Sequence, residues 1–179
     1  MNLIYNFDVN ILEFIRENTS SPFLDSIMPI ITAIGNGGIL YIILSIVLIA
    51  FKKTRRYGIM MGTALLFGFI FGNLMLKNII ARPRPFNTGY ELLINAPKDY
   101  SFPSGHTMAS FEMATVVFYM NRKIGCLAIV VASLVAFSRL YLNVHYPTDV
   151  LGGCFLGIFF GFCAIKLYKI IENKYSLDI

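Results

Sequence analysis

Long stretches without a charged residue alternate with short polar segments along this chain. The stretches at 57–76 and 124–138 contain no Asp, Glu, Lys or Arg. A 20-residue helix is about 30 Å long, which matches the hydrocarbon core of a membrane. We therefore expect an all-α fold, a polytopic membrane helix bundle of about five to six transmembrane helices. The pattern predicts five crossings, at roughly 36–52, 57–81, 104–121, 124–142 and 148–170.

The N-terminal segment has a different pattern, because charged residues interrupt its apolar positions. Asp8, Glu13 and Arg16 lie among apolar residues in 3–16. This mixture favours an amphipathic helix at the membrane surface over a crossing. A polar turn then predicts a second helix over 22–34, either re-entrant or lying on the surface, and a sixth crossing in this region stays open.

The composition indicates a membrane protein. Of the 179 residues, 56% are hydrophobic and only 14% are charged, whereas about 25% are charged in a typical soluble domain. The net charge of +5 does not indicate nucleic-acid binding, because the basic residues gather in short segments between the crossings. The expected organisation is a single membrane domain over 1–179, with N-terminal helices in 1–34 and a transmembrane core in 36–170.

Three groups of basic residues indicate an orientation. They lie at 52–56, 122–123 and 166–174, and five crossings place all three on the same face. Lys and Arg are enriched in cytoplasmic loops. We therefore expect a multi-pass protein of the cell membrane with this face in the cytoplasm, and the opposite, extracytoplasmic face holds the polar clusters described below.

Two glycine stripes are expected to bring helices together. Gly68 and Gly72, and further along the chain Gly153, Gly157 and Gly161, recur every four residues. Small residues at this spacing let membrane helices approach closely. We expect the stripes to pack helices within the chain, and a homodimer through the last stripe is the alternative.

Three polar clusters lie at the outer ends of the crossings, and they contain both histidines of the chain. Ionisable groups are costly near a bilayer and usually mark function there. Each cluster alone has a plain alternative, such as headgroup anchoring, helix capping or an acidic residue at a helix start. Three clusters on one face favour a single active site. They span 77–85, 103–106 and 138–149.

The first two clusters offer groups that bind phosphate. Prolines flank Arg84, so we expect the helix that carries Lys77 to end near Ala81 and the arginine segment to turn over the lysine. Arginine binds phosphate oxygens with two N–H groups at once, and lysine adds a point charge. Ser104 is a candidate N-cap, and Gly105 lies at the N-terminus of the next helix, where anions are favoured.

The third cluster pairs a histidine with a carboxylate. His145 and Asp149 are four residues apart and share one face if a helix begins near Pro147. A carboxylate bound to one ring nitrogen fixes the tautomer and makes the other nitrogen a better nucleophile or base. Arg139 adds another cation, and His106 can reach the same anion from the first turn of its helix. The residues alone leave open which histidine attacks.

These motifs resemble the signature of the type 2 phosphatidic acid phosphatase superfamily, which also contains vanadium haloperoxidases. The signature K-x6-R-P, P-S-G-H and S-R-x5-H-x3-D matches the three clusters at every position. Within the superfamily, the chain is similar to the small bacterial membrane phosphatases. The stretches at 24–28 and 121–125 resemble those of undecaprenyl-diphosphate phosphatases from Gram-positive bacteria.

The resemblance implies a role for each residue. His145 would attack phosphorus and form a phosphohistidine, Asp149 would orient it, and His106 would protonate the leaving oxygen and then activate water. No metal or other cofactor is expected, because three cations, a hydroxyl and an amide would stabilise the charge on the phosphate. The expected phosphate-binding residues are Lys77, Arg84, Ser104, Gly105 and Arg139.

The lead hypothesis is therefore metal-independent hydrolysis of a lipid-linked phosphate or diphosphate at the outer face of the membrane, with undecaprenyl diphosphate as the first substrate. A phosphatidylglycerophosphate or phosphatidic acid phosphatase is the alternative within the same chemistry. A protein that binds or transports lipid phosphates without hydrolysis is the alternative of another class, and the histidine–aspartate pair argues against it. The expected partners are the lipid substrate and membrane lipids, with no nucleic acid and no obligatory protein partner.

Overall fold

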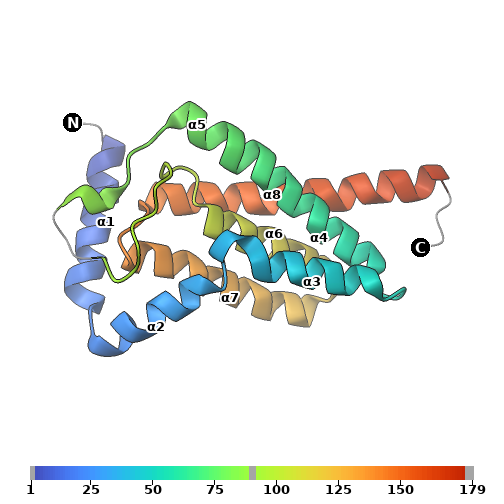
Figure 1. Ribbon diagram of the computed structural model, residues 1–179, viewed down its shortest axis with the longest axis horizontal. Coiled ribbons are helices and arrows are strands. Elements are labelled where there is room, and N and C mark those ends of the chain that lie inside the picture. The colour runs from blue at the N-terminus through green and yellow to red at the C-terminus, as the bar shows by residue number, and fades with distance from the viewer. Residues whose placement is uncertain (1–2, 89–91, 176–179) are drawn as a thin grey trace.

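The computed structural model describes residues 3–88 and 92–175, and every regular element in these two ranges is helical. The long helices run side by side as a bundle, and the first helix lies crosswise at one end (Figure 1). The membrane helix bundle expected from the sequence is thus confirmed. Within the described ranges, four stretches are long and apolar enough to cross a membrane: Pro22–Ala50, Arg55–Ile80, Arg122–Tyr141 and Pro147–Lys174.

Helix α1 (Leu3–Thr19) has the predicted amphipathic character, but its inner face is not purely apolar. Phe7 and Phe14 are exposed, whereas Asp8 is completely buried. Exposed aromatic side chains suit a helix that lies on a membrane surface, because they can enter the lipid while the other face packs against protein. α1 therefore covers one end of the bundle and turns a carboxylate towards it.

Helices α2 (Pro22–Ala33) and α3 (Ile39–Ala50) are joined by a short 3₁₀ turn, η1 (Asn36–Gly38). Gly37 and Gly38 have φ angles of +57° and +67°, which are left-handed values that favour glycine. The junction between α2 and α3 is therefore a kink. It does not separate two independent helices, so the apolar stretch of this crossing already begins at α2, earlier than the sequence pattern indicated.

The next pass is one continuous helix with a wider middle section. It consists of α4 (Arg55–Phe67), the π-helical segment η2 (Gly68–Leu76) and α5 (Lys77–Ile80). The pass ends at Ala81, whose φ of +46° is left-handed. This end point agrees with the prediction from the prolines that follow, because a proline cannot continue the hydrogen-bond ladder of a helix.

Helix α6 (Gly105–Met120) forms the centre of the bundle and contacts α4, α7 (Arg122–Tyr141) and α8 (Pro147–Tyr175). At 16 residues it is shorter than the four candidate crossings. Its neighbours cover it, and its buried face carries polar as well as apolar side chains. The starts and ends of these three helices agree with the predicted crossings to within a few residues.

Both glycine stripes pack against α6, so the intrachain packing is confirmed. A Cβ atom on Gly153 would lie 2.6 Å from the carbonyl oxygen of Ser104, and one on Gly161 would lie 2.7 Å from Cβ of Thr115. In the other stripe, Gly68 leaves room for the carboxyl group of Glu112 of α6. Any larger residue at these glycines would push η2 or α8 away from the central helix.

The two ends of the bundle differ in their chemistry. The α3–α4 turn, the α6–α7 turn and the C-terminal end of α8 lie at one end, whereas α1, the end of α5 and the α7–α8 turn lie at the other (Figure 1). The basic groups belong to the first end and the three polar clusters to the second. Their separation by the length of the bundle is what the crossing pattern predicts.

Candidate active site

The predicted histidine–carboxylate pair lies where α7 is followed by α8. His145 is only 1% exposed, and its Nδ1 lies 3.6 Å from Oδ2 of Asp149. This separation is longer than a hydrogen bond, and the Ser101 side chain lies close to both residues. The Ser101 hydroxyl donates to Oδ2 of Asp149 and lies 3.4 Å from Nδ1 of His145. The backbone N–H of Tyr146 also donates to this oxygen (2.9 Å), so several donors orient the carboxylate.

The other ring nitrogen of His145 faces a cation. Nη1 of Arg84 lies 3.1 Å from Nε2, and a guanidinium can only donate hydrogen bonds. Nε2 is therefore unprotonated, and the proton lies on Nδ1. Burial is the largest cause that lowers the pKa of His145 to about 3; the charges of Arg84 and Arg139 act in the same direction, whereas Asp149 acts in the opposite direction. The ring is thus neutral at physiological pH and presents a lone pair to the cationic side of the site.

Arg84 is held by main-chain oxygens and by a carboxylate. Its Nη1 donates to the carbonyl of Val144 (2.6 Å), and its Nε donates to the carbonyl of Asp99 (2.8 Å). Nη2 donates to the Asp99 side chain (2.6 Å), which also forms an ion pair with Lys77. Burial alone would raise the pKa of Asp99, but Lys77 and Arg84 hold it at about 2. Two predicted cations therefore share one carboxylate that the sequence did not single out.

The end of α2 and the kink that follows it contact two other predicted side chains. Nη1 of Arg139 donates to the hydroxyl of Thr32, and Nε2 of His106 lies 2.8 Å from Oδ1 of Asn36. Gly35 lies against the imidazole ring, because a Cβ atom there would stand 2.9 Å from Cδ2 of His106. The N-terminal region thus forms one wall of the site, and no motif in the sequence indicated this.

Ser104 is the N-cap residue of α6, as predicted, but its side chain does not cap the helix. Its hydroxyl accepts a hydrogen bond from Thr107 (3.0 Å), and its backbone N–H donates to the carbonyl of Asp149 (3.1 Å). The start of α6 is thereby tied to the start of α8. At Gly105, a Cβ atom would stand 2.8 Å from Oδ1 of Asn73. The group that lies close to Gly105 is thus the Asn73 side chain of the protein itself. A hydrogen bond from the Gly105 amide to phosphate stays a prediction.

The charged residues of the three predicted clusters lie close enough to interact electrostatically, so they form one site. His106 interacts electrostatically with Arg139, His145, Lys77 and Arg84. Three cations beside an unprotonated imidazole nitrogen favour binding of an anion with several oxygens, such as phosphate. Among residues 3–88 and 92–175, no group of three or more His, Cys, Asp or Glu side chains could hold a metal ion. Whether the reaction proceeds without a metal stays a prediction.

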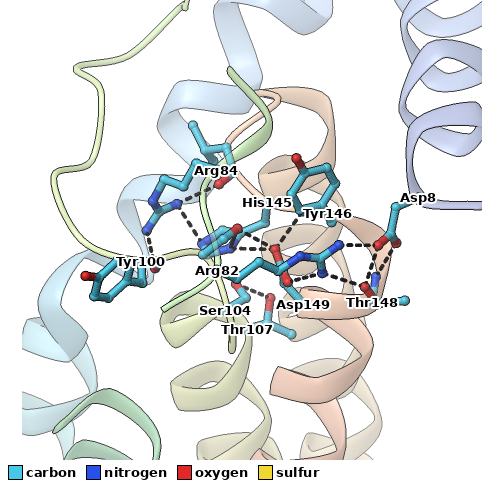
Figure 2. A network of polar contacts seen from close by, with 12 residues as sticks. Asp8, Arg82, Arg84, Tyr100, Ser104, Thr107, His145, Tyr146, Thr148 and Asp149 are labelled. Atoms are coloured by element: carbon cyan, nitrogen blue, oxygen red, sulfur yellow. Dashed lines mark hydrogen bonds and ion pairs between the residues drawn. The ribbon is translucent and has the colours of Figure 1, made fainter. Parts of the chain in front are cut away.

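A second network lies behind Asp149 (Figure 2). Nη1 of Arg82 donates to Oδ1 of Asp149 (2.6 Å), and Nη2 donates to Oδ2 of Asp8 (2.6 Å). The guanidinium carbon lies 4.0 Å from the ring centre of Tyr146. Arg82 could have been noticed in the sequence because it belongs to the same proline-flanked segment as the predicted cation. Asp8 carries no such signal, since it is one of several charges in a mixed N-terminal helix.

Known proteins are similar to this chain in sequence and in fold. The sequence matches the PAP2 superfamily over residues 53–172. It is 31% identical to the undecaprenyl-diphosphatase of Sulfolobus acidocaldarius, over 90% of this chain and 78% of the relative. It is 34% identical to the undecaprenyl-diphosphatase BcrC of Bacillus subtilis, over 84% of this chain and 86% of the relative. The fold is similar to the crystal structure of a PAP2-type phosphatidylglycerolphosphate phosphatase from Bacillus subtilis, with a TM-score of 0.77 and 28% identity, over 98% of this chain and 89% of that chain.

Proposed function

Because the chain belongs to the PAP2 superfamily, and its apolar helices and its relatives show a membrane phosphatase, we propose that it hydrolyses a lipid-linked phosphate or diphosphate through a phosphohistidine intermediate. The observation that carries this proposal is the state of His145. Its unprotonated Nε2 faces Arg84, while Asp149 stands behind the protonated Nδ1. A buried, neutral imidazole that is oriented from one side and faces a cation on the other suits nucleophilic attack on a phosphate.

In the first step, Nε2 of His145 attacks phosphorus, and the bond between phosphorus and the leaving oxygen breaks. The positive charge that develops on the imidazole is stabilised by Asp149, which keeps the proton on Nδ1. His106 donates a proton to the leaving oxygen. The charge on the transferring phosphoryl group is balanced by Lys77, Arg84 and Arg139, with Ser104 and the Gly105 amide as further donors.

In the second step, a water molecule attacks the phosphohistidine. His106 takes one proton from this water, the bond between phosphorus and nitrogen breaks, and inorganic phosphate leaves. His145 returns to its neutral form, so the two steps close a cycle. The positioned cations act in both steps, because each transition state places charge on the same phosphoryl oxygens.

Undecaprenyl diphosphate is the first substrate that we propose. Two relatives named as undecaprenyl-diphosphatases resemble this chain over most of both sequences, which supports this choice. A phosphatidylglycerophosphate or phosphatidic acid substrate is the second candidate, and the similar structure of a phosphatidylglycerolphosphate phosphatase favours it. Both substrates place a phosphate at the membrane surface with its lipid chain in the bilayer.

We propose that the active site faces the extracytoplasmic side. The bias of Lys and Arg towards cytoplasmic loops supports this orientation, because three basic groups lie at the opposite end of the bundle. A cysteine or epitope tag in the 52–56 turn should be inaccessible to a membrane-impermeant reagent in intact cells and accessible after permeabilisation. Labelling in intact cells would reverse the proposed orientation.

The reaction itself is tested with purified protein and a panel of lipid phosphates, by measuring released inorganic phosphate. We expect release from undecaprenyl diphosphate in excess chelator. His145→Ala and His106→Ala should each abolish nearly all release while the proteins stay folded. Full activity in either variant contradicts the mechanism, and no release from any lipid would favour a binding or transport protein.

A further inference from the structure

Asp8 is an unusual residue of α1 because it is buried. Its exposed fraction is 0%, whereas Glu13 and Glu17 of the same helix are exposed. A carboxylate is strongly disfavoured in a protein interior unless its oxygens are paired. A buried ion pair is also weak evidence for stability, since apolar residues often pack as well in its place. The position of Asp8 is better explained by the groups that it contacts.

Both oxygens of Asp8 bind residues next to the active site (Figure 2). Oδ2 accepts hydrogen bonds from Nη2 of Arg82 (2.6 Å) and from the hydroxyl of Thr148 (2.7 Å). Oδ1 accepts one from the backbone N–H of Thr148 (2.9 Å). Thr148 lies in the first turn of α8, directly before Asp149. Asp8 therefore satisfies a free N–H group at the start of the helix that carries the site carboxylate.

Arg82 connects the two carboxylates. Its Nη2 is bound to Asp8, and its Nη1 donates to Oδ1 of Asp149 (2.6 Å) and to the hydroxyl of Thr148 (2.7 Å). Its guanidinium carbon lies 4.0 Å from the ring centre of Tyr146, an arrangement that attracts a cation to the ring face. Both terminal nitrogens of the guanidinium are thus hydrogen-bonded and one of its faces packs against a ring, so its orientation is fixed.

We propose that Asp8 is a positioning residue for Asp149, which makes α1 a part of the active site. This inference rests on the proposed function, in which Asp149 orients the nucleophile His145. The hydrogen bond from Arg82 to Oδ1 acts together with those from Ser101 and Tyr146 to Oδ2, and in this way it helps to fix the rotation of Asp149 and keep Oδ2 towards His145. Asp8 keeps Arg82 in the direction that this bond requires. Loss of Asp8 leaves Arg82 and the first turn of α8 without their shared acceptor.

The test compares full-length variants in liposomes that contain undecaprenyl diphosphate, at a temperature where each variant is folded. Asp8→Asn removes the charge with little change of shape, and Glu17→Gln is the matched control because it removes an exposed charge from the same helix. For Asp8→Asn we expect kcat to fall about 10- to 100-fold, as for other residues that orient a functional group by a hydrogen bond. KM should change by less than about twofold, because the phosphate-binding side chains are untouched.

Two further variants separate positioning from a general loss of structure. Asp8→Glu keeps the carboxylate and should recover part of kcat. The double variant of Asp8→Asn with Arg82→Lys should be no less active than the weaker single variant, because both residues act through the same hydrogen bond to Asp149. Losses that multiply in the double variant would contradict the proposal.

The remaining outcomes also decide the matter. Unchanged kcat in Asp8→Asn overturns the positioning role while leaving the proposed function intact, provided that wild type and Glu17→Gln release phosphate. If those two proteins release none, the proposed function fails and this inference fails with it. If Asp8→Asn does not fold, Arg82→Lys alone decides, and unchanged kcat in that variant overturns the proposal.

Discussion

The carboxylate of Asp99 accepts a hydrogen bond of 2.6 Å from Nη2 of Arg84. The same carboxylate is paired with Lys77, so one side chain binds two of the three cations proposed to hold phosphate. Its pKa of about 2 keeps it ionised at any pH near neutrality. A phosphate that enters the site therefore competes with a carboxylate of the protein itself.

This competition predicts that Asp99→Asn strengthens phosphate binding. The Asp99 side chain is 52% exposed, and a pair exposed to solvent contributes at most about 1 kcal/mol. We therefore expect inorganic phosphate to inhibit the variant at about two- to fivefold lower concentration, a ratio of inhibition constants obtained from initial rates. Glu17→Gln should leave this constant unchanged. Weaker inhibition in Asp99→Asn would mean that Asp99 holds the cations in their working positions.

The proposed roles of the two histidines predict different trapped states. An activated ester such as p-nitrophenyl phosphate needs no proton on its leaving group, so His106→Asn should still form the phosphohistidine on His145. Its hydrolysis should be slower by about 10²- to 10⁴-fold, because the general base is missing. Labelled phosphate should therefore accumulate on the His106→Asn protein during the reaction, and it should remain bound to the protein when the sample is denatured in alkali. His145→Asn should carry no label, and label on that variant would reassign the nucleophile.

The pKa of His145 predicts a dependence of stability on pH. Its folded-state value of about 3 lies below the ordinary value of 6.5, so between these values the unfolded chain binds a proton that the folded protein does not. The free energy of unfolding should therefore fall as pH decreases through this window, by up to about 1.4 kcal/mol per pH unit. His145→Gln should show a shallower decrease of the thermal midpoint between about pH 6.5 and 4.5.

This pH window separates His145 from Asp99. The folded-state pKa of Asp99 is lowered to about 2 from an ordinary value of 3.8, so its contribution to stability is present above 3.8 and is lost only below that value. Measurements above about pH 4.5 therefore report on the histidine rather than on this ion pair. Parallel slopes for wild type and His145→Gln would contradict the low pKa.

Two glycines of α4 provide a test of helix packing away from the site. A Cβ atom on Gly58 would lie 2.6 Å from the carbonyl oxygen of Ser45 and 2.7 Å from the backbone nitrogen of Ile49, whereas one on Gly62 would meet only the Ser45 hydroxyl at 3.1 Å. Alanine gains about 1 kcal/mol of helix propensity, but overpacking against backbone costs about 1–3 kcal/mol. Gly58→Ala should therefore lower the unfolding midpoint in detergent, and Gly62→Ala should keep or raise it. Equal effects would contradict the close approach of α3 and α4.

Much of the active site could be predicted because its main spacings are local. His145 and Asp149 are four residues apart, and α8 begins between them at Pro147, so the local backbone at this helix start keeps them close wherever the helix lies. The prolines around Arg84 end the preceding helix at Ala81 through the geometry of the backbone alone. The number of predicted crossings also placed the three polar clusters at the same end of the bundle.

Contacts between distant segments could not be predicted. Asp8 meets Arg82 across 74 residues, and Asn36 meets His106 across 70. In the sequence, Asp8 looks like the other acidic residues of its amphipathic helix. Only its burial distinguishes it, and burial depends on how the helix is rotated against its neighbours.

The order of residues along the chain is enough to predict which groups can do chemistry and at which end of the bundle they lie. Apolar runs, charge bias and helical spacing act through the membrane and the backbone, so they can be read without knowing any tertiary contact. The contacts that hold those groups became visible in the folded protein: Asp99 lies between two cations, the α2–α3 kink lies against His106, and α1 reaches Asp149 through Arg82. These contacts depend on which helix faces meet and how closely they approach, and no spacing along the chain encodes either.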